Sequence, residues 1–179
     1  MFLGVDHLLK LVKEKKLVEN LCDRELNNPE GTGFDLRLGE IYTIAGSGFL
    51  GIDERQTCPV KILKSYNPEK KQIIEINPGD FYLVKTVEKV NLPPDLVAIF
   101  KPRTTLQRMG LFLRTSQASP GYSGELTFAL KNVGPAKVTL ELGTRIMHIM
   151  FGQVIGKTNL YRGQWQGGRV TTKKKEKQV

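Results

Sequence analysis

A single helical segment precedes a long series of short strand-like segments in this chain of 179 residues. Residues 6–18 place Leu8, Leu9 and Val12 on one face, which predicts an amphipathic helix that Asp6 can cap. The later segments alternate polar and apolar residues or are short apolar runs, and they cover residues 34–38, 72–76, 81–84, 96–100, 111–114, 125–131, 138–142 and 145–151. Because each ends near Gly, Pro or Asn, the series predicts a mainly β sandwich, jelly roll or barrel rather than an alternating α/β sheet.

The rest of the chain divides into one irregular stretch and one charged end. Residues 45–70 follow neither a helical nor a strand period and are interpreted as a surface excursion. We expect residues 1–168 to form one domain and residues 169–179 to form a basic, disordered tail. The tail contributes +4 of the formal net charge of +9, which leaves a body whose charge suits a polyanionic small molecule.

Composition excludes several classes of protein. No apolar run is long enough to span a membrane, and residues 1–6 do not resemble a signal peptide, so a cytoplasmic protein without a membrane partner is expected. Cys22 and Cys58 are too few for a disulfide framework, and His7 and His148 lie too far apart in the sequence to predict a zinc site. Nucleic acid is not an expected partner, because no aromatic-rich basic strand or recognition helix accompanies the basic tail.

The segment from Lys101 to Gly110 carries the clearest chemical signal. It reads KPRTTLQRMG and gathers two guanidinium groups and two hydroxyl groups around one predicted helical turn. Arginine offers a planar fork of donors that matches phosphate oxygens, and free backbone N–H groups at the start of a helix bind anions. The segment therefore predicts a phosphate site, with a surface loop that carries two solvated arginines as the alternative.

Four segments in order resemble the dCTP deaminase and trimeric dUTPase superfamily. Residues 33–39 (GFDLRLG) are similar to its early Gly-x-Asp-Leu-Arg-Leu-Gly strand, and residues 102–111 (PRTTLQRMGL) to its Arg-Ser-Ser-Leu phosphate motif. Residues 120–132 resemble its nucleoside-binding hairpin, and residues 142–151 its Pro-Gly-x-Arg-Ile-x-Gln motif. Residues 161–168 resemble the C-terminal segment that closes over the nucleotide, and the N-terminal helix favours the deaminase branch.

The resemblance implies a fold, a reaction and a set of partners. The fold would be a distorted jelly roll of the dUTPase-like β-clip kind with a short N-terminal helix, assembled as a homotrimer with sites between subunits. The protein would be an enzyme of pyrimidine deoxynucleotide metabolism that takes dCTP or dUTP. It would convert dCTP to dUTP, the deaminase reaction of dUTP biosynthesis, or hydrolyse dUTP to dUMP and pyrophosphate as a diphosphatase. Mg²⁺ would be held through the substrate phosphates, with no metal ligand supplied directly by the protein.

The same resemblance assigns roles to individual residues. Arg103, Thr104, Thr105 and Arg108 would bind phosphates, and Thr104 occupies the position of a serine near the reacting base. The nucleoside would be bound by Ser119, Gly121 and Tyr122, whose ring could instead be a core residue with a bonded hydroxyl. Tail closure would use Tyr161, Gln164 and Gln166, which could instead belong to a disordered polar end.

Both carboxylates that the superfamily uses in catalysis are replaced. Ala129 occupies the position of the deaminase glutamate, and Ser119 that of the dUTPase aspartate. A methyl group cannot transfer a proton, and serine is a poor base at neutral pH. The nearest acidic substitutes are Glu125, Asp35 and Glu40, of which Glu125 is preferred as a catalytic residue because it shares the hairpin strand. Lys131 follows two residues after Ala129 on the same face and is interpreted as solvated, or as a phosphate contact.

Three hypotheses follow from this combination of retained and missing residues. The first is an active deaminase or diphosphatase. The second is a catalytically lapsed nucleotide sensor or regulator that binds without turnover, which the missing carboxylates favour. The third is a trimer that binds nucleic acid through its basic tails, for which removal of residues 169–179 should abolish a salt-sensitive affinity.

Overall fold

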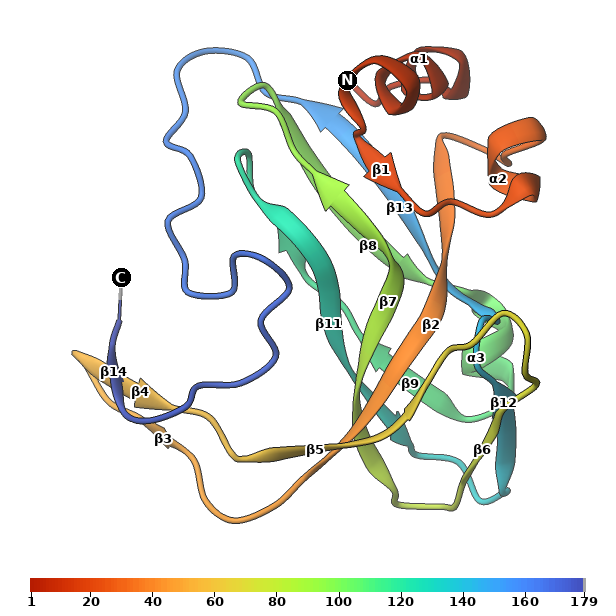
Figure 1. The fold of residues 1–179 in the computed structure, drawn as a ribbon, viewed down its shortest axis with the longest axis vertical. Coiled ribbons are helices and arrows are strands. Elements are labelled where there is room, and N and C mark those ends of the chain that lie inside the picture. Colours follow the sequence, from red (N-terminus) through yellow and green to blue (C-terminus); the bar gives the residue numbers. More distant parts are fainter. Residues whose placement is uncertain (179) are drawn as a thin grey trace.

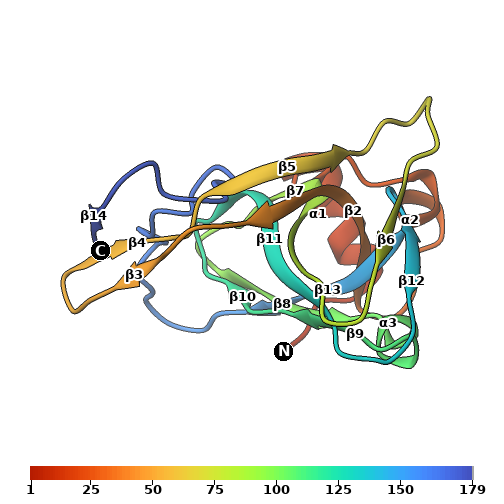
Figure 2. The ribbon, with the colours of Figure 1, turned by 90° about the horizontal axis from the view of Figure 1, so that it is seen from below.

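Most of the predicted strands join one curled antiparallel sheet, which the computed structural model describes over residues 1–178 (Figure 1). Its strand order is β10 (Gln117–Ala118), β8 (Leu96–Pro102), β13 (Arg145–Gln153), β2 (Gly33–Ile44), β7 (Phe81–Asn91), β11 (Ser123–Asn132) and β9 (Leu111–Arg114). In addition, β1 (Val18–Glu19) pairs with β7, and β5 (Val60–Ser65) pairs with β2. A separate ribbon joins β6 (Ile73–Ile76) to β12 (Val138–Glu141). Figure 2 shows that the main sheet curls into a half-barrel, so the predicted mainly β fold class is confirmed.

The core lies inside this curl because inward side chains alternate with outward ones along each strand. On β11, Leu126, Phe128 and Leu130 are buried, whereas the intervening residues are partly or fully exposed. Phe128 packs edge to face against Phe100 of β8, with ring centroids 5.3 Å apart. This register fixes which residues of the nucleoside hairpin point inward and which point to the outer face.

The N-terminal helix is shorter than predicted. Helix α1 spans Val5–Lys15, and Gly4 rather than Asp6 is its N-cap residue. The helix ends where Lys16 adopts a left-handed conformation with φ of 52°, and the chain then buries Leu17 and Val18. Strand β1 forms there because Val18 pairs with Val90 of β7, which stabilises an extended conformation over continued helix. A second helix, α2 (Asp23–Asn27), precedes β2.

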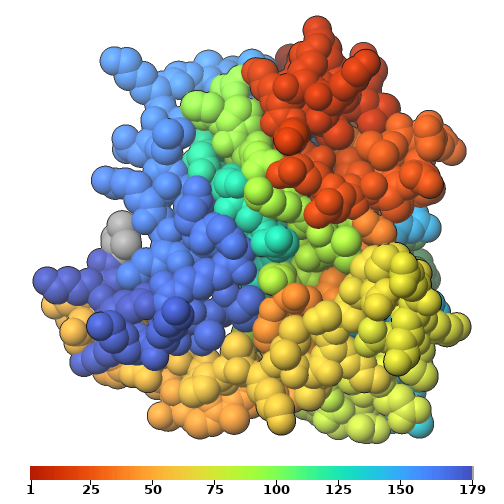
Figure 3. All heavy atoms as spheres, in the orientation of Figure 1, coloured from red at the N-terminus to blue at the C-terminus, as the bar shows by residue number. Residues whose placement is uncertain are grey.

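The stretch interpreted as a surface excursion contains two short strands that meet the C-terminal segment. β3 (Phe49–Leu50) and β4 (Glu54–Gln56) form a hairpin, and β14 (Glu176–Lys177) pairs with β4 to make a three-stranded sheet. The tail was expected to be disordered, but residues 169–178 instead lie along the β3–β4 hairpin. Residue 179 lies outside the described residues. The net charge of the tail does not predict this ordered conformation, because Arg169 and Lys175 form ion pairs with Glu176 and Glu54. Figure 3 shows the C-terminal segment, in dark blue, lying over the sheet beside the hairpin.

None of the helices formed by residues 1–178 is both long and apolar enough to cross a membrane.

Candidate functional site

The phosphate motif forms the predicted turn of helix at the end of a sheet strand. β8 ends at Pro102, Arg103 is the N-cap residue, and α3 spans Thr104–Arg108. The chain then turns at Gly110, whose φ is +81° and whose added Cβ would lie 2.7 Å from the Cα of Gly134. A glycine is required there because other residues rarely adopt this conformation and no room exists for a side chain.

The side chains of this motif differ in whether they form hydrogen bonds or ion pairs with the rest of the chain. Thr104, Thr105 and Arg108 are exposed, and their side chains make no hydrogen bond or ion pair with residues 1–178. Arg103 is partly buried and donates through Nη1 to Oδ2 of Asp35 on β2. The motif thus presents two hydroxyl groups and one guanidinium group to solvent, beside a second guanidinium group that is already oriented.

Asp35 is the centre of a buried charged cluster. Its side chain is 9% exposed, and it accepts a hydrogen bond from Arg103 and forms a 3.0 Å ion pair with Arg145. Nδ1 of His148 lies 2.9 Å from Oδ1 of Asp35. The backbone N–H of Asp35 donates to Oε2 of the fully buried Glu25 at 2.9 Å. These contacts join β2, β13, α2 and the start of α3 at a single point.

The cluster changes the titration of Asp35. Burial alone would raise the pKa of Asp35, but the hydrogen bond from His148 and the positive charges of Arg103 and Arg145 lower the pKa below its ordinary value. Asp35 therefore stays ionised at neutral pH, and it cannot act as a free general base because its oxygens are held by the arginines and the imidazole.

The nucleoside hairpin runs from β10 to β11 and turns at Gly121. Gly121 has φ of +83° and donates to the backbone of Leu92 at 3.0 Å. Tyr122 is 7% exposed, and its hydroxyl donates to the backbone oxygen of Glu125 at 2.5 Å. Burial raises the pKa of Tyr122 to about 12, so this hydroxyl stays protonated.

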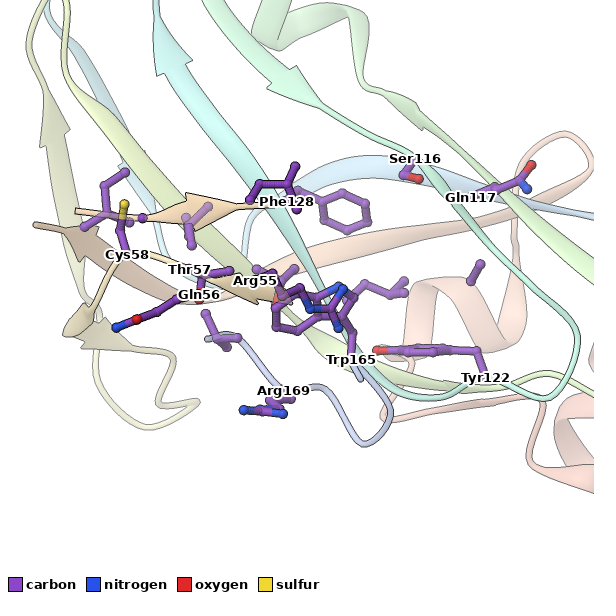
Figure 4. Close-up of a pocket in the computed structure, with 18 of the residues that line it drawn as sticks. Arg55, Gln56, Thr57, Cys58, Ser116, Gln117, Tyr122, Phe128, Trp165 and Arg169 are labelled. Atoms are coloured by element: carbon purple, nitrogen blue, oxygen red, sulfur yellow. The ribbon is translucent and has the colours of Figure 1, made fainter. Parts of the chain in front are cut away.

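A cavity of about 750 Å³ lies between the hairpin, the β3–β4 excursion and the C-terminal segment. In Figure 4, Arg55 and Trp165 lie close together, with Phe128 above them, Tyr122 to their right and Arg169 below. Its volume falls in the range of ordinary small-molecule sites, and its lining is largely apolar with a few polar side chains. The cavity is therefore of a size and character suited to a nucleoside.

Sequence reasoning missed the excursion side of this cavity. Arg55 lies over the ring of Trp165, with 4.6 Å between its guanidinium carbon and the ring centroid. Its Nε and Nη2 atoms, and Oγ1 of Thr127, are buried without a hydrogen-bond partner in the described chain. In the sequence, only the single tryptophan could have indicated this side of the cavity. The pattern of residues 45–70 does not predict which part of the fold they contact.

The residues assigned by resemblance are brought together only in part. Tyr122 and Tyr161 line the cavity and contact each other edge to face at 5.3 Å, but Ser119, Gly121, Gln164 and Gln166 are not among its lining residues. Gln166 instead joins the C-terminal segment to the nucleoside hairpin. Its side chain donates to the backbone oxygen of Gly121 at 3.0 Å and accepts from the backbone N–H of Ser123 at 3.2 Å. Gln164 donates to the backbone of Lys177 at 2.6 Å.

The phosphate motif and the cavity are separate within one chain. None of Arg103, Thr104, Thr105 and Arg108 lines the cavity in the part of the chain that the structure describes. A ligand in this cavity would therefore lie apart from these four side chains of the same chain.

The candidate replacement carboxylates also lie outside the cavity. The carboxylate of Glu125 is in contact with Gly168 of the tail, and Glu40 forms a 2.6 Å ion pair with Lys85. No aspartate, glutamate or histidine occurs among the cavity-lining residues, within residues 1–178. Ala129 is partly buried on β11, where it pairs with Arg114 and with Leu83, a residue that lines the cavity.

A metal ion held by the protein alone would need several His, Cys, Asp or Glu side chains close together. No group of three or more His, Cys, Asp or Glu side chains within residues 1–178 is arranged to hold one. The donor set therefore suits Mg²⁺ only as an ion carried on phosphate oxygens, for which few protein ligands are required.

Comparisons with known proteins agree with this architecture. A family model described as dCTP deaminase-like matches residues 2–154. A probable deoxyuridine 5'-triphosphate nucleotidohydrolase of Aeropyrum pernix is 36% identical over 138 residues, which cover 75% of this chain and 82% of that protein. A dUMP-forming dCTP deaminase of Dictyoglomus thermophilum is 31% identical over 156 residues, which cover 84% of this chain and 79% of that protein.

Among solved structures, the 2'-deoxycytidine 5'-triphosphate deaminase of Agrobacterium tumefaciens superimposes with a TM-score of 0.63 at 19% identity. The match covers 84% of this chain but 46% of that chain, so this chain spans about half its length. At this level of identity the likeness concerns the fold alone.

Proposed function

The chain belongs to the dCTP deaminase-like family, and we propose that it binds a pyrimidine deoxynucleoside triphosphate without deaminating it. The observation that carries this proposal is the cavity beside Tyr122, which is large enough for a nucleoside and to which residues 1–178 contribute no carboxylate or imidazole. Deamination requires a group that moves protons at the base, and Ala129 stands where the family motif has its glutamate. The hydroxyl of Tyr122 does not fill that role, because burial raises its pKa.

The phosphates would be bound by Arg103, Thr104, Thr105 and Arg108 of a neighbouring subunit. This assignment is supported by the exposure of three of these side chains and by their distance in the fold from the cavity of their own chain. A homotrimer with sites between subunits would bring the two halves together. Mg²⁺, carried on the phosphate oxygens, would neutralise charge there.

Binding is tested by titrating dCTP and dUTP into the protein in a calorimeter in the presence of MgCl₂. We expect saturable binding of at least one of them, with weaker binding of the matching ribonucleotide, because an aromatic wall against the sugar disfavours an added hydroxyl. UTP and inorganic triphosphate serve as controls for the sugar and for the phosphate chain. The absence of saturable heat with both deoxynucleotides would refute the proposal.

A further inference from the structure

His148 and Arg103 bind the same carboxylate, one at each oxygen. Nδ1 of His148 lies 2.9 Å from Oδ1 of Asp35, and Nη1 of Arg103 binds Oδ2. The two side chains come from β13 and the start of α3, which converge with β2 at the lower right of Figure 1. Arg103 and the imidazole are therefore bridged by one carboxylate group.

The contact with Asp35 fixes the orientation of the imidazole. An ionised carboxylate can only accept hydrogen bonds, so Nδ1 is the protonated nitrogen and Nε2 is left as the basic one. Nε2 makes no hydrogen bond with residues 1–178, and the His148 side chain is 23% exposed. An added Cβ would lie 3.0 Å from Nε2 at Gly33 and 3.9 Å at Gly31, so Nε2 faces the backbone of two residues that carry no side chain.

The charges around the imidazole favour an anion. Arg103 and Arg145 contact Asp35, and Arg24 lies 3.7 Å from it; their side chains are 30–36% exposed. The acidic groups of the cluster are Asp35 and Glu25. At the surface, Glu30 forms an ion pair with Arg24. Since arginine has five donors, each guanidinium group keeps donors for phosphate oxygens after binding a carboxylate.

We propose that His148, oriented by Asp35, is the general base of a phosphoanhydride hydrolysis at the Arg103 site. This inference rests on the proposed function, because it takes the bound deoxynucleoside triphosphate as substrate. It assigns the proton transfer to an imidazole on β13 in place of the missing carboxylates. Asp35 is then a positioning residue, and the reaction class is hydrolysis rather than deamination.

The proposed step balances with water as the only co-reactant. The water oxygen forms a bond to the α-phosphorus, and the bond from that phosphorus to the oxygen of the departing pyrophosphate breaks. One water proton passes to Nε2 of His148, and the imidazolium later returns it to solvent. The guanidinium groups of Arg103 and Arg145 would stabilise the charge on the phosphate oxygens.

The test measures pyrophosphate release from dUTP with Mg²⁺ by wild type, by His148→Gln and by His7→Gln. His7 is the matched control because it is the other histidine and lies exposed on α1, a helix that carries no residue of the Asp35 cluster. We expect a loss of roughly 100-fold or more for His148→Gln and none for His7→Gln.

Two further measurements separate chemistry from structure and from binding. Calorimetry should show that His148→Gln still binds dUTP, and added imidazole should partly restore the rate of His148→Ala, which a merely structural role would not allow. Binding of dUTP by wild type without pyrophosphate release would overturn this inference and leave the proposed function standing. Absence of dUTP and dCTP binding by wild type would overturn both.

Discussion

Replacing Asp35 with alanine is expected to lower the free energy of unfolding by about 3–5 kcal/mol, the usual cost of removing one partner from a buried ion pair. Asp35 is 9% exposed at its side chain and is contacted by Arg103, Arg145 and His148. Its removal would leave the two guanidinium groups, the imidazole and the buried Glu25 with an incomplete set of partners. Urea unfolding followed by circular dichroism measures the change.

The matched control is Glu30→Ala, which removes a carboxylate that is 82% exposed and paired with Arg24. Exposed pairs contribute little, so we expect a change of at most about 1 kcal/mol. Equal losses for the two variants would show that the cluster around Asp35 is not a centre of stability.

The same cluster predicts how stability depends on pH. Because the pKa of Asp35 is lowered in the folded state, its contribution is present above the ordinary carboxyl pKa and is lost as the pH falls through the lowered value. We expect wild type to lose stability below about pH 4, where unfolded aspartate takes up its proton. Asp35→Asn should show a smaller loss over this range, and an identical pH profile for the two proteins would contradict the assignment.

Replacing Arg108 with alanine is expected to weaken deoxynucleoside triphosphate binding by about 10- to 100-fold, because a hydrogen bond to a charged group contributes about 1.5–3 kcal/mol. Arg108 is exposed and makes no ion pair with the described residues, so its removal should leave the free energy of unfolding unchanged. Calorimetry with dCTP and dUTP measures the affinity, and thermal unfolding without nucleotide checks the stability.

Lys10→Ala on α1 provides the control for a lost surface charge, since that helix carries no residue of the phosphate motif. Arg108→Lys tests the geometry, because lysine keeps the charge but not the planar fork of donors. An affinity of Arg108→Ala equal to that of Lys10→Ala would remove Arg108 from the phosphate site.

The sequence predicts the parts of the fold that depend on local alternation. β9 was predicted with its observed bounds, Leu111–Arg114, and the alternation of β11 correctly separated the face of Ala129 and Lys131 from the buried face. The end of α1 was predicted too late, because the pairing of Val18 with Val90 is a contact between distant segments. The hairpin of β3 and β4 was missed for the same reason: its partner strand, Glu176–Lys177, lies more than a hundred residues away.

The site was predictable where one motif carries it and not where several segments meet. The residue types and spacing from Arg103 to Arg108 predict a turn of helix that carries phosphate-binding side chains. The turn of helix is confirmed. The link of Asp35 to His148 spans 113 positions and depends on the pairing of β2 with β13, which no local pattern encodes. Arg55 and Trp165 belong to segments more than a hundred residues apart, and no local pattern predicts that they meet.

The most direct test of binding without deamination is a single-turnover experiment with the protein in excess over labelled dCTP. The protein is held at a concentration that calorimetry shows to saturate the nucleotide, with Mg²⁺ present, and the reaction is quenched over time and resolved by chromatography. We predict that every labelled nucleotide recovered still carries cytosine. Conversion of the bound label to dUTP or dUMP would contradict the proposal and would require a proton-transfer group at the base other than Ala129.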